Sequence, residues 1–170
     1  ARISPACARR GPRSGVDRGA RRQAMPKFET RHKVRHAAAD MFALVADVEA
    51  YPKFVPLCEA LKVRGRQSRP DGSSVLIADM TVSYKVFRET FTSRVTLIPA
   101  ENRILVEYLD GPFRQMENRW TFTPLTEKTC EVGFFIAYEF KSRTLGALMG
   151  AVFERAFHKF AGAFESRADE

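Results

Sequence analysis

The sequence has few of the residues that build covalent or metal-held sites. Its 170 residues include three cysteines, Cys7, Cys58 and Cys130, and three histidines. An odd number of cysteines without metal-ligand spacing argues against a disulfide framework or a zinc site and favours reduced thiols. The chain also has no Gly-rich phosphate loop. We therefore expect no metal and no resident cofactor.

Long hydrophobic runs are missing as well. No stretch has the length and apolarity of a membrane-spanning helix, and residues 1–24 lack the apolar core of a secretory signal. These absences predict a cytoplasmic protein, with peripheral contact at the inner membrane as an option. If the source is eukaryotic, we expect a mitochondrial location.

Positive charge is concentrated at the N-terminus. The chain has a net charge of +8, and residues 1–24 supply +6 of it through seven arginines and a single acid, Asp17. The Arg-, Gly- and Ser-rich composition of this segment predicts a disordered tail. It faintly resembles a mitochondrial transit peptide, and the plainer alternative is that Met25 is the true start. The remaining residues carry about +2, so the overall charge does not by itself indicate a nucleic-acid partner.

One long amphipathic segment lies near the C-terminus. Residues 141–167 predict a helix, because apolar side chains recur at helical spacing, and Ser142 is a candidate N-cap. The apolar face consists of Leu145, Leu148, Met149, Val152, Phe153, Ala156, Phe160 and Phe164. A helix with so wide an apolar face needs a sheet to pack on.

The preceding residues alternate between polar and apolar side chains with the period of β-strands. We expect strands at 27–36, 60–66, 74–87, 88–98, 103–109, 114–124 and 129–140, a helix at 37–48, and a loop with a short helical turn at 51–57. The predicted fold is α+β, with a curved antiparallel sheet of about seven strands wrapped around the C-terminal helix.

Six motifs occur in the body of the chain. They span Phe42–Val48, Tyr51–Cys58, Phe91–Val95, Leu109–Phe113, Trp120–Pro124 and Tyr138–Phe140. Together they resemble the coenzyme Q-binding START-domain proteins, which are grouped with the polyketide cyclase/dehydrase and lipid transport superfamily and with bacterial ribosome-association toxins. The likeness covers residues 25–168, which we treat as one lipid-binding domain. It implies a helix-grip (START/Bet v 1-like) fold whose cavity binds ubiquinone, and a role as a quinone carrier or chaperone in respiration or quinone biosynthesis.

The inward parity of the strands and the apolar helix face predict which residues line such a cavity. They are Met80, Tyr84, Phe91, Val95, Val106, Tyr108, Met116, Asn118, Trp120, Phe134, Ile136, Leu145, Leu148, Met149, Val152 and Phe153. The tyrosines, the asparagine and the tryptophan are candidate donors to quinone oxygens. The alternative is that these side chains simply fill one another and leave no cavity.

Two apolar connections are candidates for the cavity mouth. The loop at 51–57 contributes Tyr51, Phe54 and Val55, and the turn at 110–113 contributes Phe113. Such residues are suited to transient contact with a membrane surface during ligand exchange. The alternative is local packing over the open end of the sheet.

A ribosome-binding role is the second hypothesis. If the first two strands are neighbours, their outward cations form one basic patch of Arg31, Lys33, Arg35, Lys62, Arg64 and Arg66. Such a patch is suited to ribosomal RNA, although a solvated sheet face has the same pattern. We predict no catalytic residues, and DNA is not an expected partner. The residual enzyme hypothesis pairs His32 with Tyr84 or Asp110.

Overall fold

The computed structural model describes residues 26–170, so the predicted disordered tail lies outside the described residues. The described part contains seven strands and four helical segments. In chain order these are β1 (Lys27–Val34), α1 (Ala38–Ala46), η1 (Val48–Lys53), β2 (Cys58–Ser68), β3 (Ser74–Tyr84), β4 (Phe87–Ile98), η2 (Pro99–Glu101), β5 (Arg103–Asp110), β6 (Phe113–Thr126), β7 (Thr129–Phe140) and α2 (Arg143–Ala168).

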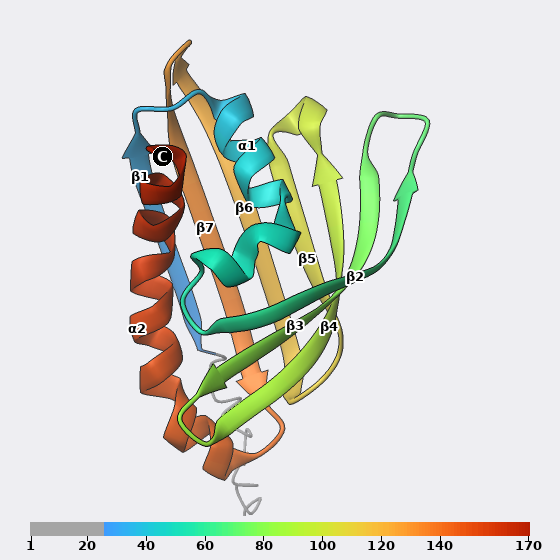
Figure 1. Cartoon of the computed structure of the whole chain (residues 1–170), viewed down its shortest axis with the longest axis vertical. Coiled ribbons are helices and arrows are strands. Elements are labelled where there is room, and N and C mark those ends of the chain that lie inside the picture. The colour runs from blue at the N-terminus through green and yellow to red at the C-terminus, as the bar shows by residue number, and fades with distance from the viewer. Residues whose placement is uncertain (1–25) are drawn as a thin grey trace, which may run out of the picture.

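The strands form a single antiparallel sheet in the order β1-β7-β6-β5-β4-β3-β2. From β2 to β7 each strand pairs with the next strand in sequence, whereas β1 crosses over to pair with β7. The sheet curves, and α1, η1 and α2 lie on its inner side (Figure 1). The predicted α+β helix-grip fold is therefore confirmed. No helix in the described range has the length and apolarity needed to cross a membrane.

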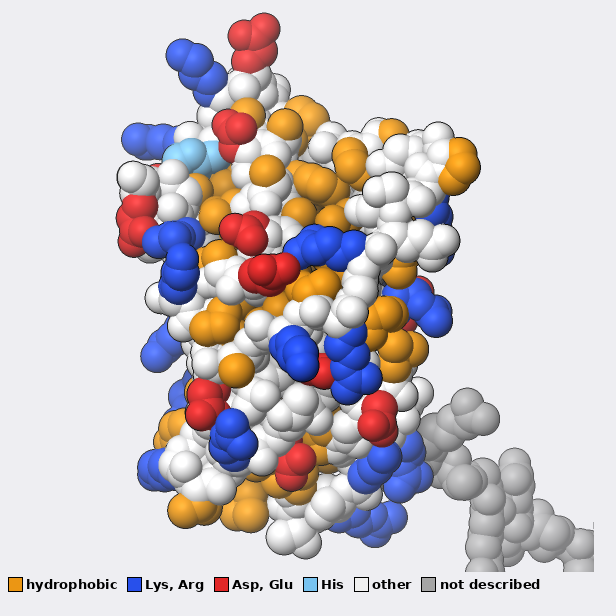
Figure 2. Space-filling model, turned by 45° about the vertical axis from the view of Figure 1, so that its right-hand side comes forward, with side chains coloured by type: hydrophobic (Ala, Val, Ile, Leu, Met, Phe, Trp, Pro, Cys, Tyr) orange, Lys and Arg blue, Asp and Glu red, His pale blue; other side chains and the backbone are white. Residues whose placement is uncertain are grey.

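Alternating burial along the strands creates the inner layer of the core. In β6, Met116, Asn118, Trp120 and Phe122 are buried while the residues between them are exposed, as the sequence pattern predicts. Figure 2 shows charged side chains standing out from the surface, with hydrophobic side chains visible between them.

Helix α2 is fixed at both ends. The hydroxyl of Ser142 accepts a hydrogen bond from the backbone N–H of Leu145 at 3.2 Å, which confirms the expected N-cap. At the other end, His32 of β1 contacts Glu165, and His36 contacts Asp169 at 2.6 Å. These contacts hold the C-terminal half of α2 close to β1 and β7.

The β5–β6 turn lies against β4 because residue 111 is glycine. Gly111 has φ of +141°, a conformation that side chains disfavour, and a Cβ atom there would lie 2.6 Å from the Cβ of Phe91. This close approach fixes the position of Phe113, which follows the turn and is 3% exposed.

Candidate functional site

A cavity of about 130 Å³ lies between the sheet, the C-terminal half of α2 and the connection from η1 to β2. Every strand from β2 to β7 contributes to its wall, and so do η1 and α2. The alternative in which the inward side chains fill the whole space is therefore wrong for this region. The size is close to that of an engineered apolar cavity of about 150 Å³ that binds benzene.

Ten of the sixteen predicted ligand-binding residues line this cavity. They are Met80, Phe91, Val95, Val106, Met116, Asn118, Trp120, Phe134, Ile136 and Phe153. All but Phe153 come from the middle of the sheet, where the period-two pattern determines which side chains face inward.

The other six predicted residues lie away from the cavity, mostly at the end of the molecule where α2 begins. Leu145, Leu148, Met149 and Val152 belong to the first turns of α2, and Leu148 is 69% exposed. Tyr84 is at the end of β3. The Tyr108 hydroxyl accepts a hydrogen bond from the backbone N–H of Phe113 at 3.1 Å, so it supports the β5–β6 turn.

The predicted apolar face of α2 contains four of the five helix residues that line the cavity, although only Phe153 is among the predicted ligand-binding residues. Besides Phe153, the helix contributes Ala156, Phe157, Phe160 and Phe164. Phe157 carries a usable signal, because it is four residues after Phe153 and three before Phe160. The remaining lining residues that were not among the predicted site residues are Val48, Pro56, Leu57, Leu61, Ala78, Val82, Ser93 and Ile104.

Three of the four residues predicted at the mouth also line the cavity, namely Tyr51, Val55 and Phe113. The Tyr51 hydroxyl donates to the backbone oxygen of Val45. Phe54 packs instead against the ring of Phe164, with a centroid distance of 5.1 Å. The 51–57 segment therefore packs over the inner side of the sheet and forms part of the cavity wall.

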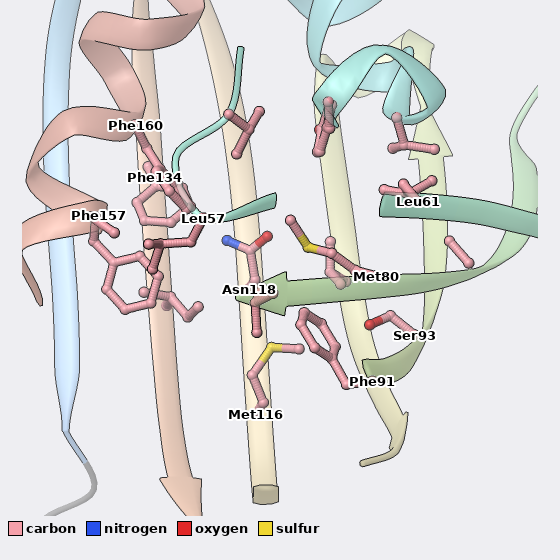
Figure 3. A pocket seen from close by; sticks show the side chains of 18 of the residues that line it. Leu57, Leu61, Met80, Phe91, Ser93, Met116, Asn118, Phe134, Phe157 and Phe160 are labelled. Carbon is pink, nitrogen blue, oxygen red and sulfur yellow. The ribbon is translucent and has the colours of Figure 1, made fainter. Parts of the chain in front are cut away.

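Leu57 forms part of the rim. It has a φ of +66°, which is uncommon for a branched side chain, and its carbonyl accepts a hydrogen bond from Ser83 N at 3.0 Å. In Figure 3 the Leu57 side chain lies beside Phe134, Phe157 and Phe160. The strained backbone thus directs Leu57 toward the aromatic side of the cavity.

Two polar groups stand out in this apolar lining. Asn118 lies between the aromatic cluster and the side formed by Met80, Met116 and Phe91, and the Ser93 hydroxyl lies near Phe91 (Figure 3). Asn118 donates to the Phe135 carbonyl at 2.8 Å and accepts from Trp120 Nε1 at 3.2 Å. Its amide nitrogen retains a second hydrogen, since an amide NH₂ has two donors.

The cavity is electrically neutral at physiological pH. Tyr51 is the one ionisable phenol among the lining residues, and burial raises its pKa well above the usual range, with smaller contributions from Cys58 and Asp47. Behind the wall, burial raises the pKa of Tyr138, and Glu154 adds to the effect. Within residues 26–170, no cluster of His, Cys, Asp or Glu is suited to hold a metal ion.

The single basic patch expected from the first two strands does not form, because β1 and β2 are opposite edges of the sheet. Three of its six cations also have carboxylate partners. The pairs are Arg31 with Glu131 at 3.7 Å, Arg64 with Asp79 at 2.6 Å and Arg66 with Glu49 at 2.6 Å. The other three members are Lys33, Arg35 and Lys62.

The pairing of His32 with Tyr84 or Asp110 is also unsupported. His32 is on β1 and contacts Glu165 of α2. Four strands separate β1 from β3 in the sheet, and two separate β1 from β5. His32 is not among the residues that line the cavity.

The buried thiol of Cys58 lies next to the cavity wall and gives a pH-dependent prediction. Burial raises its pKa from 9.0 to about 11, so the thiolate fraction at pH 7.5 falls about 100-fold. We expect iodoacetamide to alkylate Cys58 at least about 100-fold more slowly in the folded protein than in urea, with a rate that rises with pH. Peptide mass spectrometry measures this rate, and rapid alkylation of the folded protein at pH 7.5 would contradict the neutral thiol.

Comparison with known proteins agrees with this architecture. The chain is 32% identical over 146 residues to the ribosome association toxin RatA of Escherichia coli, which covers 86% of this chain and 89% of RatA. It is 30% identical over 141 residues to the mitochondrial coenzyme Q-binding protein COQ10 of Drosophila melanogaster, covering 81% of this chain and 56% of that protein. The Zhui aromatase/cyclase of Streptomyces sp. R1128 superposes with a TM-score of 0.72 at 19% identity, covering 85% of this chain and 94% of that one. The model of the polyketide cyclase/dehydrase and lipid transport family matches residues 34–165, and the chain belongs to this family.

Proposed function

We propose that the protein binds ubiquinone in the cavity and acts as a quinone carrier or chaperone in respiration or quinone biosynthesis. The observation that carries the proposal is the composition of the wall, which is apolar and aromatic except for a few polar groups such as Asn118 and Ser93. A benzoquinone ring has oxygen acceptors and no charge. It therefore matches a neutral cavity with a spare amide hydrogen and a hydroxyl.

The aromatic side of the cavity supports a ring-shaped ligand. Phe134 is 5.7 Å from Phe160 and 4.7 Å from Trp120, centroid to centroid. A planar ring gains from edge and face contacts with such side chains. Met80 and Met116 supply unbranched, adaptable contacts on the other side.

The size of the cavity constrains the pose of the ligand. At about 130 Å³ it is below the range of about 300–1,000 Å³ typical of sites that enclose a whole drug-sized ligand. The proposal therefore places only the quinone head group inside, with the isoprenoid tail leaving past the rim at Leu57. A widening of the rim would admit more of the tail.

Binding is better supported than catalysis. An aromatase/cyclase is among the proteins with a similar fold, but at 19% identity this likeness concerns the fold alone. General acid–base chemistry needs a group that titrates near neutral pH. Among the residues that line this cavity, the ionisable side chain is Tyr51, whose hydroxyl is already donated to Val45.

The ligand load of Ala156→Leu tests the proposal, because this change adds an isopropyl group to the cavity wall. Full-length protein purified gently from quinone-producing cells should release ubiquinone into an organic extract, measured by mass spectrometry. We expect Ala156→Leu to reduce this load at least about fivefold, because it fills the space that the head group needs. The free energy of unfolding should stay within about 1 kcal/mol, since an empty space accepts the new atoms.

Ala151→Leu is the matched control, because Ala151 is on the same helix and exposed. It should carry the wild-type load. A wild-type extract without quinone would contradict the choice of ligand. A full load on folded Ala156→Leu would show that the quinone binds elsewhere.

A ribosome-associated function is the second candidate, and the likeness to RatA over 89% of that protein favours it. With the predicted patch divided between two edges, another surface is needed. A groove of about 270 Å³ on the sheet includes Arg31, Arg103 and Arg119 together with Glu29. Each arginine also has a carboxylate partner, namely Glu131, Glu101 and Glu117, so RNA phosphates would have to displace these ion pairs. Arg31 of β1 is the register partner of Gly133 of β7, and Gly133 is the register partner of Thr121 of β6. Thr121 is in turn paired with Arg103 of β5, so these residues form one row across four neighbouring strands.

The ribosome hypothesis predicts co-sedimentation with purified ribosomes that weakens steeply between 50 and 200 mM KCl. The double change Arg103→Gln/Arg119→Gln should reduce the slope of the logarithm of the binding constant against the logarithm of salt concentration by about two. Arg64→Gln/Arg66→Gln on the distant β2 edge is the control and should leave it unchanged. Absence of co-sedimentation at 50 mM KCl, or a slope that both pairs alter equally, would contradict this candidate.

A further inference from the structure

Two aliphatic side chains are exposed at the end of the molecule where α2 begins. Val86, in the β3–β4 turn, is fully exposed at 103%, and Leu148 on α2 is 69% exposed. Phe87, the first residue of β4 after this turn, packs on Phe153 of α2, with 6.2 Å between the ring centroids. Figure 1 shows the β3–β4 hairpin and the first turns of α2 at the same lower end.

The backbone of the turn presents Val86 in an unusual way. Tyr84 pairs with Phe87, so the turn itself consists of Lys85 and Val86 alone. Lys85 has φ of +53°, and turns of this kind ordinarily use Gly, Asn or Asp at positive φ. The turn instead holds a cation and an aliphatic side chain at its apex.

Cations occur in both segments that carry these two side chains. Lys85 is in the turn, while Lys141 and Arg143 are at the start of α2, whose first turn has no acidic residue. Cations at a helix N-terminus are disfavoured by the helix dipole, so this end attracts anions. In the described part of the chain, Lys85, Lys141 and Arg143 have no carboxylate within ion-pair distance, unlike many arginines of the sheet. Figure 2 shows hydrophobic side chains beside charged side chains of both signs at the lower end.

We propose that this hairpin–helix tip, formed by Lys85, Val86, Lys141, Arg143 and Leu148, docks on a bilayer that contains anionic phospholipids. Exposed aliphatic side chains gain by entering the boundary between head groups and acyl chains, and the cations are attracted to the phosphates. RNA would use the cations but leave Val86 and Leu148 in water, so the combination favours a bilayer. Docking rests on the surface alone and does not depend on which ligand the cavity takes.

The tip is also continuous with the cavity wall. Phe153, which packs on Phe87, is itself one of the lining residues. Val86 directly precedes Phe87, so the turn is linked to the cavity wall through the contact of Phe87 with Phe153. The tip is distinct from the residues predicted at the mouth, since Val55 and Phe113 are buried.

Vesicle flotation of the full-length chain tests the proposal, with vesicles of phosphatidylcholine containing 30% phosphatidylglycerol and vesicles of phosphatidylcholine alone. We expect binding to the anionic vesicles at 100 mM NaCl. Val86→Ser/Leu148→Ser should weaken the apparent affinity at least about tenfold, since both side chains lose apolar contact. Both positions are exposed, so the circular dichroism and melting temperature should not change.

Two controls account for the seven arginines of residues 1–24, which every variant shares. Leu125→Ser changes an exposed aliphatic residue in another part of the sheet and should bind within about twofold of the wild type. Lys85→Gln/Lys141→Gln/Arg143→Gln should weaken binding more than Lys53→Gln/Lys62→Gln/Lys128→Gln, which removes the same number of positive charges elsewhere on the surface.

The outcomes separate the possibilities. Equal flotation of the wild type and Val86→Ser/Leu148→Ser would overturn the proposal and assign the binding to other cations. Loss with the charge variant but not with Val86→Ser/Leu148→Ser would indicate a polyanion surface such as RNA, which also overturns docking on a bilayer. Loss with both tip variants, and retention by both controls, is the supporting result.

Discussion

The packing of the C-terminal half of α2 on the inner face of the sheet determines the rest of the structure. Phe157 and Phe164 are each 6% exposed or less, and they meet Phe134 and Trp120 at centroid distances of 6.1 and 5.0 Å. The contacts of His32 and His36 hold the helix end at the same edge. Because the helix is anchored near β1 and β7, it cannot also fill the space over β3, β4 and β5.

That geometry explains both the presence and the character of the cavity. Bulky rings occupy the side next to α2, while Ala156 is the short residue on the helix face and leaves room before the sheet. The space is covered by η1 and by the connection from η1 to β2, and Tyr51 of η1 is held by the Val45 carbonyl. Its neutrality follows from composition, since the acids of the strand interiors face outward and pair there with arginines, as Glu131 and Asp79 do.

Much of this could be predicted from the sequence, and the exceptions have physical causes. The alternation in β6 identified which side chains face inward, and helical spacing identified α2. The position of the cavity along α2 depends on sheet curvature, which no local pattern encodes, so Leu148 was predicted inside and Phe157 was missed. The patch that joined Arg31 to Arg64 failed because strand order across a sheet is a long-range property. The Lys85–Val86 turn lacks the Gly or Asn that usually marks such a turn. The strand predicted at 74–87 therefore includes these two residues, whereas β3 ends at Tyr84.

The central claim is that the cavity accepts a quinone ring, and the single tryptophan of the chain, Trp120, lies in its wall. Titration with a short-chain ubiquinone, followed by the fluorescence of Trp120, tests the claim most directly, because a quinone in contact with an indole quenches its emission. The account predicts saturable quenching at low micromolar quinone, beyond the linear collisional quenching of free N-acetyltryptophanamide. Quenching that stays linear, and equals that of the free indole, would contradict it.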